Sequence, residues 1–280
     1  MIREDITDQD QINALRLDIE NPIREQEVYV CFEGETDVQL FRKFFNRDNC
    51  RLEYVPGGKS GVEKFVTDRS GKIPLTIGIR DADFLHLENK IPSHPNIFLT
   101  DSHDMEMVLV SFDEIFSAIL FEYTQLKKEE HKVVRENILK AIRFVGYFRW
   151  LNEIEVLEIE FDRLDFGSLF DEKNFQLNER ELVSMSLERS RNVKNKDTSL
   201  LLSKISQLMD VNHDLFQLCN GHDFMKVLSI YINRKVSRKI KYENLESQFR
   251  TTYTLQHYQS TNLYKNTLNW ATEQSCNLYQ

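Results

Sequence analysis

The chain has 280 residues, which at roughly 150 residues per domain predicts about two domains, and hydrophobic residues make up 41% of it, enough for a substantial core. Nine glycines and five prolines are too few for a fibrous or linker-rich architecture. The 45 acidic and 36 basic side chains give a net charge of −9, which excludes a uniformly basic nucleic-acid coat and leaves room for a local basic patch.

Cysteine spacing and the lack of long apolar runs bear on location. Cys31, Cys50, Cys219 and Cys276 form no C-x-x-C pair and no cluster with histidine, so they predict no structural zinc site and are typical of a reducing compartment. Residues 1–11 lack the apolar segment of a secretory signal, and no apolar run approaches the roughly 18 residues of a membrane span. The sequence therefore predicts a soluble cytoplasmic protein.

The first 110 residues alternate between predicted strands and predicted helices. After the first strand, Thr36 and Gln39 have the spacing of a capping box, and apolar residues at 40–45 share one helical face. A tight PGGKSG loop at 56–61 precedes a second helix. This alternation predicts an α/β fold with a parallel, right-handed sheet. The predicted strands are the short apolar runs at 27–32, 51–55, 75–79 and 96–100.

Beyond Ser111 apolar residues recur at helical spacing and convincing strands are scarce. The sequence therefore predicts an α/β core of Rossmann-like βαβ units at residues 1–111 and a helical accessory region at 112–280. The predicted helical stretches are 112–123, 129–151, 179–190, 198–209, 222–233 and 262–275.

Acidic side chains follow three of the predicted strands. Glu33 ends the first strand, Asp81 and Asp83 follow the third, and Asp104 and Glu106 open the helix after the fourth. Ligands of parallel α/β sheets bind at the carboxyl ends of the strands, so these carboxylates are expected to converge on one crevice. If the third strand continues to Asp83, alternation points Asp81 and Asp83 to one side. A hard divalent cation such as Mg²⁺ would relieve the repulsion among them.

Each acid also has an ordinary structural interpretation. Asp37, in a first helical turn, would complement the helix dipole, and Asp104 and Glu106 would do the same for their own helix. Asp81 and Asp83 would be turn residues. The metal-site hypothesis depends on all three acidic groups standing at successive strand ends.

Four motifs resemble those of the Toprim domain, the fold of topoisomerases, primases, RNA-maturation nucleases and OLD-type nucleases. They are VCFEGETD at 30–37, GGK at 57–59, RDADF at 80–84 and HDME at 103–106. The arrangement is similar to a bacterial Toprim-like family that includes AriB, the nuclease effector of the PARIS anti-phage defence system. CNGHD at 219–223 also resembles that family, although its members often carry lysine in place of His222.

The resemblance implies a metal-dependent endonuclease that uses Mg²⁺ or Mn²⁺ and hydrolyses phosphodiester bonds. It makes Glu33 the principal metal-site acid and a candidate general base, and Asp37 a ligand or a group that orients one. It also implies RNA, with tRNA as one candidate, as the substrate, an active homodimer, and an ABC-type ATPase partner similar to AriA that restrains a toxic effector until infection. The metal ligands that it implies are Glu33, Asp81, Asp83, and Asp104 or Glu106.

Three cationic side chains lie close to the acids. Lys59 follows two glycines and would contact a scissile phosphate or lie solvated in its loop, since the segment lacks P-loop spacing. Arg80 would neutralise the adjacent Asp81, and His103 is interpreted as a surface histidine at a helix start.

Two basic runs stand out in this acidic chain, NRKVSRKIK at 233–241 and a second cluster at 189–196. They would bind a phosphate backbone or form solvated helix faces. The aromatic residues between Tyr253 and Trp270 predict a core or a partner interface rather than a base-stacking platform. The candidate nucleic-acid contacts are Arg234, Lys235, Arg238 and Lys239.

Two alternative functions remain at this point. A non-catalytic Toprim-like module would bind nucleic acid or the ATPase, and its acids could be replaced without loss of function. A haloacid-dehalogenase-like phosphatase is favoured only by the spacing of Asp81 and Asp83, because Leu85 stands where that family has threonine or valine and because Glu33 would have no role.

Overall fold

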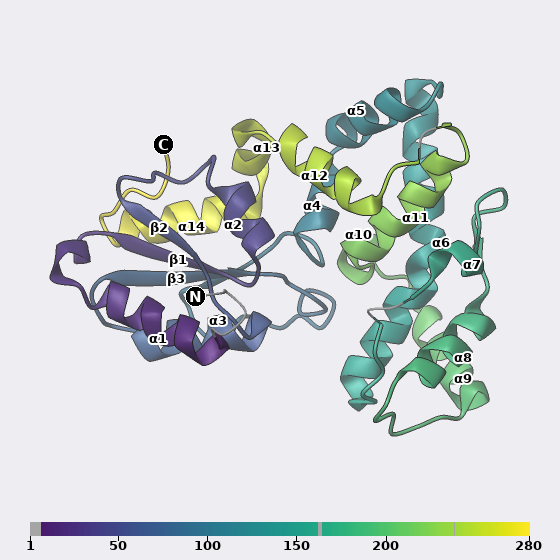
Figure 1. Cartoon of the computed structure of the whole chain (residues 1–280), viewed down its shortest axis with the longest axis horizontal. Helices are drawn as coiled ribbons and strands as arrows, with labels where there is room; N and C mark the ends of the chain where they lie inside the picture. Colours follow the sequence, from purple (N-terminus) through teal and green to yellow (C-terminus); the bar gives the residue numbers. More distant parts are fainter. Residues whose placement is uncertain (1–6, 162–163, 238) are drawn as a thin grey trace. The chain divides into compact units, whose positions relative to one another are not determined.

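The computed structural model describes residues 7–161, 164–237 and 239–280, and a four-stranded parallel sheet organises its N-terminal part (Figure 1). The sheet has the order β2-β1-β3-β4, and every neighbouring pair is parallel. The predicted α/β class with a parallel sheet is therefore confirmed. The strands are β1 (Val28–Phe32), β2 (Cys50–Tyr54), β3 (Leu75–Arg80) and β4 (Ile97–Leu99).

Helices cover both faces of this sheet (Figure 1). On one face, α1 (Asp8–Ile19) and α3 (Gly58–Arg69) share a core with Tyr29 and Cys31 of β1. On the other face lies α2 (Glu35–Phe41), where Phe32 stacks on Phe41 with ring centroids 5.1 Å apart. Successive side chains of β1 thus enter opposite layers, which explains why this strand is a continuous apolar run.

The helix α2 begins without the capping box that was expected at Thr36. The helix α1 was not predicted. Gly34 is the N-cap residue of α2 and makes no side-chain cap bond, so the capping box expected at Thr36 is wrong. Thr36 lies inside the first turn because the helix already begins at Glu35. A capping box stands instead at α1, where Thr7 and Asp10 bond each other reciprocally.

The chain forms two compact units whose boundaries differ from the predicted division at residue 111. The first contains the sheet, Lys90–Met105 and the C-terminal segment Tyr253–Gln280, and the second contains Asp83–Asn89 and Glu106–Thr252. The C-terminal segment joins the first unit through aromatic contacts. Phe44 stacks on Tyr258 at 5.0 Å between ring centroids, and α14 (Asn262–Glu273) contacts β4. The expectation that this aromatic segment contributes to a core is confirmed.

The second unit is almost entirely helical in its described residues. Every stretch predicted from helical spacing beyond residue 111 is a helix, and α7, α10, α12 and α13 are further helices that were not predicted. None of the described helices has the length and hydropathy of a membrane span. The predicted helices of this unit are α5 (Asp113–Tyr123), α6 (Lys128–Glu155), α8 (Glu179–Arg189), α9 (Thr198–Met209) and α11 (Gly221–Asn233). The remaining elements of the chain are η2 (Pro22–Arg24), α4 (Met105–Ser111), α7 (Phe166–Leu169), β5 (Phe170–Asp171), β6 (Gln176–Leu177), α10 (Leu215–Leu218), α12 (Tyr242–Thr252) and α13 (Leu255–Ser260).

The CNGHD segment has a structural role at the start of α11. The Asn220 side chain caps the helix by accepting from the Asp223 N–H (3.2 Å). Asp223 is buried and accepts two hydrogen bonds from the Arg149 guanidinium (2.8 and 3.1 Å), while His222 lies 2.6 Å from Glu246. This motif therefore fixes α11 against α6 and α12 within the second unit.

Replacing Gly61 with alanine is expected to lower the free energy of unfolding by more than about 3 kcal/mol, because a Cβ there would lie 2.1 Å from the Pro56 carbonyl oxygen. Gly71→Ala is the matched control, since no atom lies within 4 Å of its Cβ position and only its φ of +70° opposes alanine, at about 1 kcal/mol. Urea denaturation of both variants tests this, and equal losses would contradict it.

Candidate acidic active site

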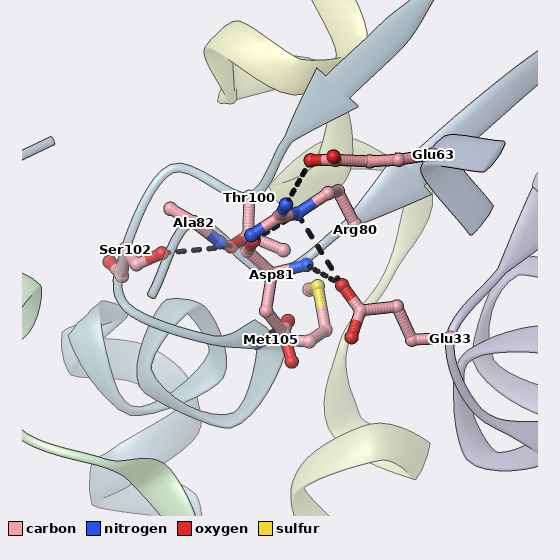
Figure 2. A network of polar contacts seen from close by, with 8 residues as sticks. All are labelled: Glu33, Glu63, Arg80, Asp81, Ala82, Thr100, Ser102 and Met105. Carbon is pink, nitrogen blue, oxygen red and sulfur yellow. Dashed lines mark hydrogen bonds and ion pairs between the residues drawn. The ribbon is translucent and has the colours of Figure 1, made fainter. Parts of the chain in front are cut away.

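Glu33 stands at the carboxyl edge of the sheet, directly after β1. Its Oε1 accepts a hydrogen bond from the Asp81 N–H (3.2 Å) at the end of the adjacent strand β3, and the Arg80 Nε lies 3.5 Å from the same oxygen (Figure 2). Its Oε2 lies 4.0 Å from the point where a Cβ on Gly58 would stand. The carboxylate therefore lies where β1, β3 and the glycine turn after β2 meet.

Arg80 is the last residue of β3, and its guanidinium joins two carboxylates. Its side chain is only 5% exposed, and its Nη1 donates to Glu63 Oε1 on α3 (2.5 Å). Its Nε also donates to the Asp81 carbonyl (3.0 Å). Arg80 thus lies between Glu33 and Glu63 (Figure 2), and its expected neutralisation of Asp81 stays a prediction.

Sequence reasoning missed Glu63 as a part of this site. Its only signal is its place on α3, about one turn beyond Lys59 and on the helix that begins at the GGK turn. A helix that starts at the carboxyl edge of a sheet brings its first turns close to the neighbouring strand ends, so its polar side chains are candidates for such contacts.

Asp81 connects the end of β3 to the start of α4. Its Oδ1 accepts from the Met105 N–H (3.1 Å), and the Ala82 N–H donates to Thr100 Oγ1 (3.0 Å). The Thr100 hydroxyl in turn donates to the Ser102 carbonyl (2.8 Å; Figure 2). These bonds hold the segments after β3 and β4 together and orient the Asp81 carboxylate.

Three other predicted residues lie in the same unit as Glu33. The Asp37 carboxylate leans back toward Gly34, whose Cβ position would be 3.2 Å from Asp37 Oδ2. Lys59 lies in the first turn of α3 rather than in a loop, and Asp104 is buried immediately before α4. His103 is also buried, at 4% exposure, so its interpretation as a surface histidine is wrong.

Asp83 and Glu106 belong to the second unit. The strand β3 ends at Arg80 and Asp83 has a φ of +48°, so the alternation expected to align Asp83 with Asp81 does not extend this far. Glu106 is buried in the first turn of α4, with the Arg250 Nη1 3.9 Å from its Oε1. The structure therefore brings Glu33 and Asp81 into contact through the Asp81 N–H. Asp83 and Glu106 belong to a different unit from these two residues.

The basic run at 233–241 carries contacts of its own. Arg234 pairs with Glu172 (3.1 Å), the Lys235 ammonium lies 4.8 Å from the centre of the Tyr231 ring, and Lys239 is exposed. Arg238 lies outside the described residues. In the second basic cluster, Lys194 pairs with Glu158 (3.0 Å). Such pairs occur on solvated surfaces and do not prevent contact with a phosphate backbone.

The cysteines are poor candidates for metal ligands or nucleophiles. Burial raises the pKa of Cys50 to about 12 and raises the pKa of Cys31 well above its ordinary value. The pKa of Cys276 is also raised by burial. Because the thiolate is the form that attacks electrophiles, burial disfavours these three thiols as nucleophiles.

The donor chemistry at the carboxyl edge of the sheet fits Mg²⁺ or Mn²⁺. These ions take carboxylate oxygens, and Mg²⁺ commonly uses only one or two protein carboxylates together with water and substrate phosphates. Glu33 and Asp81 supply that donor type. No group of three or more histidine, cysteine, aspartate or glutamate side chains suited to a metal ion occurs among the residues that the structure describes.

Comparisons with models of protein families and with curated proteins find no match for this chain.

Proposed function

We propose that the chain is a metal-dependent nuclease with a Toprim-like core. The observation that carries this proposal is the contact between Glu33, at the end of β1, and the Asp81 N–H, at the end of β3 (3.2 Å). It supports an acidic site at the edge of a parallel sheet where α/β proteins bind ligands. The likeness of residues 30–37 and 80–84 to Toprim motifs supports phosphodiester hydrolysis as the reaction.

Each residue has a distinct task in this proposal. When bound, Mg²⁺ or Mn²⁺ activates a water molecule and offsets the charge that develops on the phosphate. Glu33 and Asp81 are the carboxylates that would hold the ion, and Glu33 also takes up a proton as the general base. Arg80, whose Nε lies 3.5 Å from Glu33 Oε1, orients the Glu33 carboxylate. Lys59 contacts the scissile phosphate from the first turn of α3.

The proposed biological setting follows from the family resemblance. It consists of RNA as the substrate, with tRNA as the first candidate, a homodimer as the active form, and an ABC-type ATPase that restrains the nuclease until phage infection. An uncontrolled nuclease harms its own cell, so restraint by a partner is consistent with the reaction.

A cleavage assay tests this function. Purified protein is incubated with end-labelled tRNA and with duplex DNA of similar length, in Mg²⁺, Mn²⁺ or EDTA. We expect metal-dependent cleavage of the RNA and none in EDTA. Cleavage of DNA alone would change the substrate class, and equal cleavage in EDTA would contradict the role of a metal.

The position of Arg80 favours a second candidate function. Its guanidinium already offsets the charge of Glu33 without a metal ion, as it would in a Toprim-like module that binds nucleic acid or the ATPase and cleaves nothing. Under this alternative the protein binds labelled tRNA or the ATPase with the same affinity in Mg²⁺ and EDTA, and Glu33→Gln leaves that affinity unchanged.

Neutralising the basic run is expected to weaken nucleic-acid binding without affecting the fold. The variant replaces Arg234, Lys235, Arg238 and Lys239 with glutamine, and it should lower tRNA affinity and make the salt dependence shallower because fewer counterions are released. Replacing Lys128 and Lys132 on α6, in the same unit, with glutamine is the control. Fluorescence anisotropy in a salt series measures both quantities, and a wild-type slope would assign the run to a solvated surface.

A further inference from the structure

β2 is the outermost strand of the sheet on one side, and part of its backbone points away from β1. The Asn49 carbonyl accepts from the first residue of β1 (2.8 Å), and the Val55 N–H donates to the last (3.0 Å). The peptide groups of a strand alternate in direction, so those of Leu52 and Tyr54 point outward. No strand pairs with this edge among the residues that the structure describes.

Two adjoining cavities lie along this edge. One, of about 610 Å³, is lined by α1, α2 and β2 and includes Leu15, Val38, Leu52 and Tyr54. The other, of about 500 Å³, shares Leu52 with it and continues to the start of β2. Because α1 and α2 cover opposite faces of the sheet (Figure 1) and β2 is its edge strand, residues of all three elements line the first cavity. We refer to the two cavities together as the β2 groove.

Charges of opposite sign are separated along the β2 groove. Asp18 and Glu35 line only the cavity that contains Tyr54, and Arg47 and Arg51 line only the cavity that contains Cys50, together with Asp48. Arg42 and Glu53 line both, and Arg51 is already paired with Glu27 (2.8 Å), so among the described residues Arg47 supplies the unpaired charge of the arginine end. Glu35, Arg42 and Arg47 form no ion pair with any described residue, and all three are exposed. Scattered charges usually protect an edge strand from pairing, whereas charges separated by sign match a partner of opposite polarity.

We propose that the β2 groove binds the same groove of a second copy of this chain, so that the two sheets join edge to edge in an antiparallel pair. A twofold axis beside Leu52 places this residue opposite Leu52 of the second copy, and Tyr54 opposite Cys50 of the second copy. The acidic end of each groove then meets the arginine end of the other, and this contact occurs twice because the interface is symmetric. In this arrangement the outward peptide groups of Leu52 exchange hydrogen bonds across the axis, and the Tyr54 N–H donates to the Cys50 carbonyl of the second copy, whereas the Cys50 N–H already donates to the Asn46 carbonyl (2.8 Å).

This inference gives the homodimer of the proposed function a surface, and it does not require the protein to be a nuclease. Self-association is measured without substrate or metal, so failure of the cleavage assay and failure of the dimer are separate results. The groove differs from the acidic site because its polar contacts come from α1, α2 and β2 rather than from β3 and α3.

A charge-exchange experiment tests the proposal. Sedimentation velocity over a concentration series measures the dimer of the wild type and of two variants, Arg47→Glu and Glu35→Lys. Each variant alone places like charges together twice and is expected to dissociate at least about tenfold more readily. An equimolar mixture of the two variants restores both attractive contacts, so it should form a heterodimer near the wild-type affinity.

A backbone variant supplies the second measurement. Leu52→Pro removes an outward N–H without removing a bond to β1, and Leu52→Ala is its control because alanine keeps that N–H. The dimer should weaken at least about tenfold in the proline variant relative to the alanine variant. A wild type that stays monomeric would overturn the proposal and leave the groove to a strand of another protein. A dimer that neither Arg47→Glu nor Glu35→Lys weakens, or a mixture that fails to associate, would also overturn it.

Discussion

Glu33→Gln is expected to lower the rate of metal-dependent cleavage by at least about 100-fold, a larger loss than that from changing a group that only orients a ligand. Glutamine keeps the shape of the side chain, and its carbonyl oxygen can still accept from the Asp81 N–H. It removes the negative charge that a divalent ion requires and the group that takes up a proton. Single-turnover cleavage of labelled tRNA measures the effect. Glu20→Gln, at the exposed end of α1 in the same unit, is the matched control.

The same variant tests the effector role in cells. The wild-type chain, expressed with its ATPase partner and a phage trigger, is expected to arrest growth, and Glu33→Gln should abolish the arrest while the protein accumulates to the same level. Growth arrest that persists with Glu33→Gln would contradict the nuclease hypothesis and favour the non-catalytic binding module. A cleavage rate equal to wild type would remove Glu33 from the site altogether.

Local patterns were sufficient to predict the four strands of the sheet and most of the longer helices of the second unit. Residues 28–32 form a buried strand because their apolar side chains enter both layers, and the spacing of apolar residues predicted α6 and α11. Parallel strands end at the same edge, and this rule alone predicted that Glu33 and Asp81 would be neighbours. These predictions required no knowledge of distant contacts.

Long-range contacts explain what the sequence could not predict. The return of Tyr253–Gln280 to the first unit depends on ring contacts such as Phe44 with Tyr258, which have no periodic signal in the sequence. The partners of Arg80 were missed for a similar reason. A long flexible side chain at a strand end reaches several acids, and its choice of Glu63 depends on how α3 lies on the sheet.

The position of Arg80 changes the charge balance of the acidic site. Crowded carboxylates would repel, so removing one would stabilise a metal-free protein. With Arg80 beside Glu33, removing either charge leaves the other with one partner fewer, which is destabilising. The acidic edge is therefore a mixed-charge network. Arg80 already supplies part of the positive charge that a metal ion would supply.

Arg80→Met is expected to lower the free energy of unfolding in EDTA by about 2 kcal/mol, less than the roughly 3–5 kcal/mol for breaking a fully buried ion pair, because Glu63 is partly exposed. It should also raise the affinity for Mg²⁺ about tenfold, since Glu33 and Glu63 lose the cation that competes with the ion. Binding to the folded state stabilises it in proportion to affinity, so the increase in Tm caused by Mg²⁺ should be larger in this variant than in the wild type.

Arg69→Met is the matched control for this measurement. Arg69 is a buried arginine of the same unit, but its guanidinium donates to the Ile73 carbonyl (2.9 Å). Its loss should lower the Tm in EDTA without changing the increase caused by Mg²⁺. Isothermal titration with Mn²⁺ gives the affinities directly, and Glu33→Gln combined with Arg80→Met should abolish the added response. An Mg²⁺-dependent increase in Tm no larger in Arg80→Met than in the wild type would show that Arg80 does not compete with the metal for Glu33.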